Sequence, residues 1–128
     1  RHATGKIIHS NSNLVIDYTH FVDFIMNQPK SNYRKFHCVT PSWDNSARRK
    51  QFALIINNST PQKYQHWLEW ALQQSQSDSK GEPIVFINGW NEWAEGNHLE
   101  PDQKWGHGYL EATLNALKMI NEHSEMPS

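Results

Sequence analysis

The sequence predicts an α/β fold built from parallel strand–helix–strand units. Three segments have the apolar spacing of amphipathic helices, and two short apolar runs between them are typical of buried strands. Each of these runs leads into a loop rich in polar and aromatic residues. Strands that alternate with helices favour a parallel sheet. Since two strands cannot make a stable parallel sheet covered on both faces, we expect the rest of the sheet to lie outside this chain.

The composition of the 128 residues fits one globular domain and excludes several classes of protein. Fifteen aromatic residues, six of them Trp, argue against a disordered chain. The formal net charge of −1 gives no field that would hold the chain on nucleic acid, and no apolar run is long enough to span a membrane. The single cysteine, Cys38, excludes a disulfide framework within the chain.

The helices are predicted from their apolar spacing and their caps. The first covers Asn13–Asn27, is capped by its first residue, and ends before Pro29. The second starts after Thr60, a good N-cap, with Pro61 at the first helical position. The third covers His107–Asn121. We expect three stripes to face the core: Leu14, Tyr18, Phe21, Val22 and Ile25; Tyr64, Trp67, Leu68, Ala71 and Leu72; and Leu110, Thr113, Leu114, Leu117 and Ile120.

The two predicted strands are Lys35–Val39 and Pro83–Ile87. The second run is apolar throughout, as expected for a parallel strand buried on both faces. Cys38 lies inside the first run, so we expect it to be a core residue. The run Phe52–Ile56 suits either a strand or a buried loop, and its residues do not decide between them.

The loop after the second strand carries the strongest functional signal. Asn88–Pro101 holds three carboxylates within nine residues, interleaved with Trp and Asn. Glycosidic-bond chemistry needs one carboxyl at the bridging oxygen and a second carboxyl that assists at the sugar ring. Glu92 and Glu95 are three residues apart, so a helical turn would bring them to the same side. The alternative is a solvated acidic loop whose Trp residues fill the mouth of a barrel.

Other side chains of the two loops are candidates for binding a sugar, because Trp faces pack against sugar C–H groups while polar groups bond hydroxyls. The loop Pro41–Arg49 adds carboxylate, amide and guanidinium groups, although an Asp–Asn turn with a structural Arg–Asp pair is its alternative interpretation. Parallel strands of a barrel open onto one face, so we expect Trp43–Asn45 to line the same pocket as Glu92. The candidates for substrate contact are Trp43, Asp44, Asn45, Arg48, Trp90, Asn91, Trp93, His98 and Glu100.

Several sequence blocks, taken in order, resemble the WbsX-type family. The blocks are PSWDNSARR at 41–49, STP at 59–61, Trp67–Leu68, FINGWNEWAEGNHLE at 86–100, Pro101–Asp102 and GYLE at 108–111. That family is named as glycosyltransferases of bacterial cell-surface polysaccharide synthesis, and its domain is related to glycoside hydrolase family 99, the endo-α-mannosidases. The resemblance implies that residues 1–128 are the C-terminal part of a (β/α)8 TIM-barrel-like catalytic domain, completed in cis by a missing N-terminal barrel segment.

The resemblance also implies roles for the two glutamates, because in family 99 the N-E-W-x-E-G block carries both catalytic carboxylates. The position of Glu92 acts as a base on the sugar 2-hydroxyl and gives an epoxide-like anhydrosugar instead of a glycosyl-enzyme ester. The position of Glu95 is the general acid/base at the glycosidic oxygen. The implied partner is an oligo- or polysaccharide of the O-antigen type, handled in the bacterial cytoplasm. The PSWDN block is more characteristic of the WbsX-type branch, so the substrate need not be a mannoside.

The type of activity stays open on the sequence. A sugar-nucleotide transferase would be expected to carry a D-x-D or glycine-rich diphosphate site, which these residues lack, although the family name favours transfer. A retaining hydrolase or transglycosylase needs only the groups in Asn88–Pro101, so we favour hydrolase-like chemistry. A non-catalytic carbohydrate-binding or scaffolding module is the alternative to an enzyme. The eight His residues show no metal-ligand spacing, so we expect neither a metal nor a cofactor.

Overall fold

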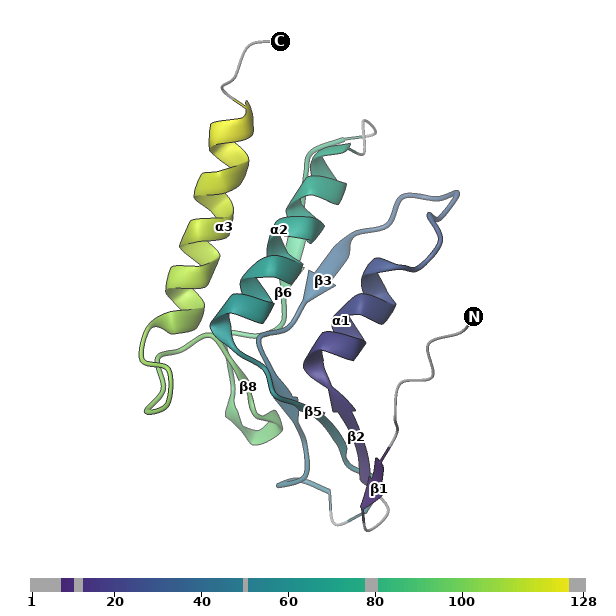
Figure 1. The fold of residues 1–128 in the computed structure, drawn as a ribbon, viewed down its shortest axis with the longest axis vertical. Coiled ribbons are helices and arrows are strands. Elements are labelled where there is room, and N and C mark those ends of the chain that lie inside the picture. The colour runs from purple at the N-terminus through teal and green to yellow at the C-terminus, as the bar shows by residue number, and fades with distance from the viewer. Residues whose placement is uncertain (1–7, 11–12, 50, 78–80, 125–128) are drawn as a thin grey trace.

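A computed structural model describes residues 8–10, 13–49, 51–77 and 81–124, which form a mixed α/β unit (Figure 1). The predicted α/β class is confirmed, while the wider barrel stays a prediction because the described strands form three separate small sheets. The helices of the described residues are α1 (Tyr18–Met26), α2 (Pro61–Ser77) and α3 (Gly108–Ser124). The sheets are β1 (Ile8–Ser10), β2 (Asn13–Asp17), β5 (Leu54–Asn57) and β4 (Trp43–Asp44), in that order; β3 (His37–Val39) with β6 (Val85–Ile87); and β7 (Asn91–Glu92) with β8 (Asn97–His98).

The first predicted helix is wrong over its first five residues. These residues form β2, which pairs in parallel with β5. The run Phe52–Ile56, for which the sequence allowed either a strand or a buried loop, therefore contributes a strand. The Leu-Val-Ile sequence of β2 suits a strand as well as it suits a helix face. The helix begins one turn later, where Asp17 rather than Asn13 caps it by accepting a hydrogen bond from the Thr19 amide at 2.9 Å.

The second predicted helix is confirmed. It begins at Pro61, and Thr60 caps it by accepting a hydrogen bond from the Lys63 amide at 3.2 Å. The helix lies between α1 and α3 and packs against both, so its buried side chains form the centre of the core (Figure 1). These side chains are Pro61, Tyr64, Trp67, Leu68 and Ala71, while Leu72 is partly buried.

The third predicted helix is confirmed as a helix, but the face that we expected to be buried is partly wrong. Leu114 and Leu117 are 51% and 46% exposed, and Leu110 and Thr113 are half-buried. Ala112 and Ala116 lie at the interface in place of Leu114 and Leu117, because α3 packs closely against α2, whose Ala71 is itself fully buried. The buried residues of α3 are Tyr109, Ala112, Ala116 and Ile120.

The strands β3 and β6 pair in parallel, as predicted, but the described elements cover only one face of this pair. Val39, Val85 and Ile87 pack into the core beside α2. Cys38 and Phe86 stand opposite each other and are exposed. The expectations of a strand buried on both faces and of a core Cys38 are therefore wrong for the described part of the chain.

Replacing Ala116 with Leu should lower the free energy of unfolding by about 1–3 kcal/mol, because a fully buried position against α2 has no room for a larger side chain. Urea denaturation of the protein measures this change. Leu117→Ala is the matched control on the exposed side of the same helix, and its effect should stay near about 0.5 kcal/mol or below. Equal losses at the two positions would contradict this assignment of the buried face.

Candidate functional site

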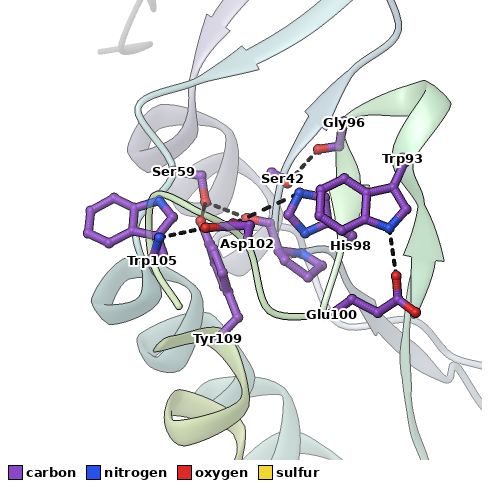
Figure 2. A network of polar contacts seen from close by, with 10 residues as sticks. Ser42, Ser59, Trp93, Gly96, His98, Glu100, Asp102, Trp105 and Tyr109 are labelled. Carbon is purple, nitrogen blue, oxygen red and sulfur yellow. Dashed lines mark hydrogen bonds and ion pairs between the residues drawn. The ribbon is translucent and has the colours of Figure 1, made fainter. Parts of the chain in front are cut away.

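The two loops that carry the predicted site touch each other beyond the C-terminal end of the β3–β6 pair. The Ser42 hydroxyl donates a hydrogen bond to the Gly96 carbonyl at 2.5 Å (Figure 2). The Thr40 hydroxyl oxygen lies 2.9 Å from both the Ser42 carbonyl oxygen and Oδ1 of Asn97, and it donates its one proton to one of them at a time. Asn97 is fully buried between the loops. Two parallel strands therefore bring their following loops to one end, as the sequence predicts.

Both candidate carboxylates lie on one tight hairpin. The strands β7 and β8 are antiparallel and are joined by a 3-10 turn, η1 (Trp93–Glu95). Gly96 ends this turn with φ of +55°, in the left-handed region that favours glycine. A Cβ atom on Gly96 would lie 3.1 Å from Cβ of Asp44 and 3.2 Å from its backbone nitrogen. Only glycine therefore allows the hairpin to rest directly on β4.

The two glutamates of the hairpin have different surroundings. Arg48 Nη1 donates a hydrogen bond to Glu95 Oε1 at 3.0 Å, which links the turn to the loop after β4. The Arg48 side chain is 57% exposed and that of Glu95 is 23% exposed, so this ion pair stabilises the fold by about 1 kcal/mol at most. Its consequence is the orientation of Glu95. Glu92 is exposed on β7 and has no ion pair among the described residues.

Three of the predicted substrate-contact residues, Trp93, His98 and Glu100, form contacts with one another (Figure 2). The Trp93 and His98 rings are stacked, with centroids 3.7 Å apart and planes 21° from parallel. The Trp93 indole N–H donates a hydrogen bond to Glu100 Oε2 at 2.6 Å. His98 Nε2 lies 3.9 Å from Asp102 Oδ2, and the two side chains are only 13% and 14% exposed. Asp102 was missed by the sequence interpretation, and its signal is the i, i+4 spacing from His98.

A polar pocket of about 280 Å³ lies beside this network. Trp43 and Asp44 line it together with His98, as expected for residues of the two loops. Asn45 and Glu92 are not among its lining residues, so one pocket shared by Trp43–Asn45 and Glu92 stays a prediction. The sequence interpretation also missed several lining residues from other segments: Ser59, Asp102, Lys104, Trp105 and Tyr109.

The loop after β4 has the Asp–Asn turn that was the alternative interpretation of this segment. Asp44 Oδ1 accepts a hydrogen bond from the Ser46 amide at 2.9 Å, and Asn45 Oδ1 accepts one from the Leu54 amide at 2.8 Å. The Arg–Asp pair of that alternative does not form, because the carboxylate that pairs with Arg48 is that of Glu95. The side-chain oxygen of Asn45 therefore holds the loop against β5.

The inner wall of the pocket is neutral and hydrogen-bonded. The Tyr109 hydroxyl lies 2.8 Å from Oγ of Ser59, which donates to the Pro41 carbonyl (Figure 2). Burial raises the pKa of Tyr109, and so does the negative charge of Asp102, whereas the hydrogen bond between Tyr109 and Ser59 acts in the opposite direction. Tyr64 contacts the Tyr109 ring edge-on, and burial raises the pKa of Tyr64 to about 12. Both phenols are therefore uncharged near neutral pH.

Comparisons with known proteins place the chain among glycan-related sequences. A family model described as "Glycosyltransferase WbsX" matches residues 1–113. Two curated relatives, each named "Uncharacterized protein WxcX" and found in two strains of Xanthomonas campestris pv. campestris, are 36% identical over 104 residues. The match covers 80% of this chain and 15% of each relative, so the chain spans a small part of their length. No solved structure matches significantly, and no helix of the described residues is long and apolar enough to cross a membrane.

Replacing Gly96 with Ala should lower the free energy of unfolding by about 1–3 kcal/mol and loosen the hairpin. The left-handed backbone is strained for any residue with a Cβ, and the new Cβ would also lie too close to Asp44. Urea denaturation measures the loss.

Gly106→Ala is the matched control, because Gly106 has the same φ of +55° and an added Cβ would meet no atom within 4 Å. It should lose only the backbone part, about 1 kcal/mol. If the two variants were equally stable, the close contact with Asp44 would not constrain the hairpin.

Proposed function

Because the chain belongs to the WbsX glycosyltransferase family, we propose that it supplies the catalytic carboxylates of an enzyme that makes or breaks glycosidic bonds in complex cell-surface polysaccharide. Family membership indicates a glycan-related enzyme role. The observation that carries the finer assignment is the presentation of Glu92 and Glu95 on one hairpin that rests against the loop after β4.

In the proposed reaction Glu92 is the base and Glu95 is the acid. Glu92 takes the proton of the sugar 2-hydroxyl, whose oxygen then bonds to the anomeric carbon. The glycosidic bond breaks at the same time, and the departing oxygen receives a proton from Glu95. In the second half, water or a sugar hydroxyl attacks the anomeric carbon and gives its proton to Glu95. The bond between the anomeric carbon and the 2-oxygen breaks at the same time, and the 2-oxygen recovers its proton from Glu92. Water as the attacking group gives hydrolysis with retention, and a sugar hydroxyl gives transfer.

The surroundings of the two carboxylates support these different roles. Glu92 is exposed, so a sugar hydroxyl can reach it. Glu95 is more buried, and Arg48 holds its Oε1 while Oε2 has no hydrogen-bond partner among the described residues. A positioned carboxyl with one free oxygen is what proton transfer to a bridging oxygen needs. This positioning supports the assignment of Glu95 as the acid/base, while the ion pair with the Arg48 guanidinium suits the stage at which the ionised Glu95 accepts a proton.

The remaining groups of the hairpin and the pocket suit a sugar. Trp90 and Trp93 are each about half exposed, and the Trp93 ring is stacked on His98 through one of its two faces. Exposed indole faces can pack against the C–H groups of a sugar ring. Asp44 in the pocket and Asn91 on β7 are exposed acceptors or donors for hydroxyls. Asn45 and Glu100 are bound to Leu54 and Trp93, so we assign them to positioning the two loops.

Glu92→Gln and Glu95→Gln should each lower kcat by about 10²–10⁴-fold, because each change removes a proton transfer while it keeps the shape of the side chain. The double variant should lose far less than the product of the two single losses, since both groups act in the same step. Release or transfer of sugar from an oligosaccharide by the full-length enzyme measures the effect. Glu122→Gln on the exposed side of α3 is the matched control and should keep the normal rate.

A substrate with an activated leaving group separates the two roles. It should restore the bond-breaking half of the reaction in Glu95→Gln, seen as a burst of released leaving group, because such a group leaves without protonation, whereas the second half still lacks its base. It should not rescue Glu92→Gln. Near-normal rates for both single variants would contradict the proposed chemistry. Binding of oligosaccharides without any turnover by the unmodified enzyme would favour a non-catalytic carbohydrate-binding module.

A further inference from the structure

A second cavity, of about 430 Å³, lies at the other end of β3 from the glutamate hairpin. Its lining residues come from the C-terminal ends of α1 and α2 and from the connection between α1 and β3. His37, the first residue of β3, lines this cavity, whereas Thr40, just after the last residue, contacts the loop of the hairpin. The cavity is therefore separate from the proposed catalytic site.

Among the described residues, three cationic residues and no carboxylate line this cavity. Lys30, Arg34 and Lys35 all come from the connection before β3. Across the described ranges, none of the three has a carboxylate within 4.0 Å. Arg34 donates a hydrogen bond to the Glu82 carbonyl at 3.1 Å and lies 4.6 Å from the centre of the Phe36 ring. In a chain with a net charge of −1, this is a strong local excess of positive charge.

The rest of the wall can accommodate an anion of moderate size. Trp70 packs edge-on against His37, with ring centroids 4.9 Å apart, and forms a rigid side of the cavity. Asn32, Gln74 and Ser77 contribute neutral hydrogen-bonding groups. The Arg34 guanidinium is already held by the Glu82 carbonyl and the Phe36 ring, so Lys30 and Lys35 are the cations left for a ligand. A ligand with two or more negative charges would therefore be bound more tightly than a single carboxylate.

We propose that this cavity binds a phosphate or diphosphate group. Guanidinium and ammonium groups in one concave site, with neutral donors beside them, are the groups that proteins use for phosphate oxygens. The group belongs either to a small soluble molecule or to a lipid headgroup, since both offer the same oxygens. The proposal does not depend on the chemistry assigned to Glu92 and Glu95.

His37 provides a direct readout of binding. Burial lowers the pKa of His37, and the positive charge of Lys35 lowers it further. The other titratable groups around the cavity are Lys30, Tyr33 and Arg34, whereas the α1 and α2 side chains that line it carry no charge. A bound phosphate would offset the positive charges, so it should raise the pKa of His37 in an NMR titration.

Calorimetric titration of the protein with pyrophosphate tests the site. We expect binding at low ionic strength that weakens as NaCl is added, because salt screens charges at an open site. Lys30→Gln and Lys35→Gln should each weaken binding by about tenfold, the usual effect of losing one charge-assisted hydrogen bond. Lys118→Gln, which removes an exposed cation from α3, is the matched control and should leave the Kd unchanged. Thermal unfolding of each variant confirms that it is folded.

Vesicles of phosphatidylcholine with and without phosphatidic acid distinguish the two sources of phosphate. Pyrophosphate binding that depends on Lys30 and Lys35 assigns a soluble phosphate ligand. Binding only to vesicles with phosphatidic acid, with the same dependence, assigns a lipid headgroup. Binding to neither probe, equal weakening by Lys118→Gln, or an unchanged pKa of His37 in the presence of bound pyrophosphate would overturn the proposal. The rates of the glutamate variants are measured separately, so either proposal can fail without the other.

Discussion

Gly96 allows two loops that are far apart in the sequence to touch backbone to backbone, and the site depends on this approach. A Cβ at this position would lie 3.1–3.2 Å from atoms of Asp44, so a side chain here would require Asp44 or the hairpin to shift by a few tenths of an ångström, in addition to the strain of the left-handed backbone. With the loops in contact, Ser42 reaches the Gly96 carbonyl and Arg48 reaches Glu95. The fully buried Asn97 then closes the junction against Thr40. A position with no side chain therefore decides where the charged side chains lie.

Local signals in the sequence predicted only those elements whose boundaries are set locally. The second helix was predicted correctly because Thr60 and Pro61 determine its start without help from the rest of the fold. The first helix was placed too early because β2 exists through its pairing with β5, which no local spacing shows. On α3 the hydrophobic pattern favoured Leu117, whereas close packing against α2 selects the smaller Ala116. Each incorrect prediction concerns a feature that contacts between distant segments determine.

The difference between local sequence signals and contacts of distant segments also applies to the site. The alternation of strands and helices was enough to bring the two loops to one end of β3 and β6. It could not show which side chains are already bound within the protein. Asn45 holds Leu54 and Glu100 holds the Trp93 indole, so two residues that resembled sugar ligands are positioning groups in this geometry. Asp102 was missed because its importance comes from the buried contact with His98, not from the composition of the loop.

These internal contacts have a consequence for how the hairpin would meet a substrate. Asp102 lies 3.9 Å from His98, His98 covers one face of Trp93, and Glu100 accepts a hydrogen bond from the indole N–H (Figure 2). Trp93 begins the turn that ends with Glu95, so a ring that is fixed at two points also fixes the turn that carries the carboxylate. A side chain that is already ordered loses less conformational entropy when a ligand binds. The ordering of Trp93 therefore favours both the binding of a sugar on its open face and the alignment of Glu95 with the glycosidic oxygen, because one rigid turn holds both groups.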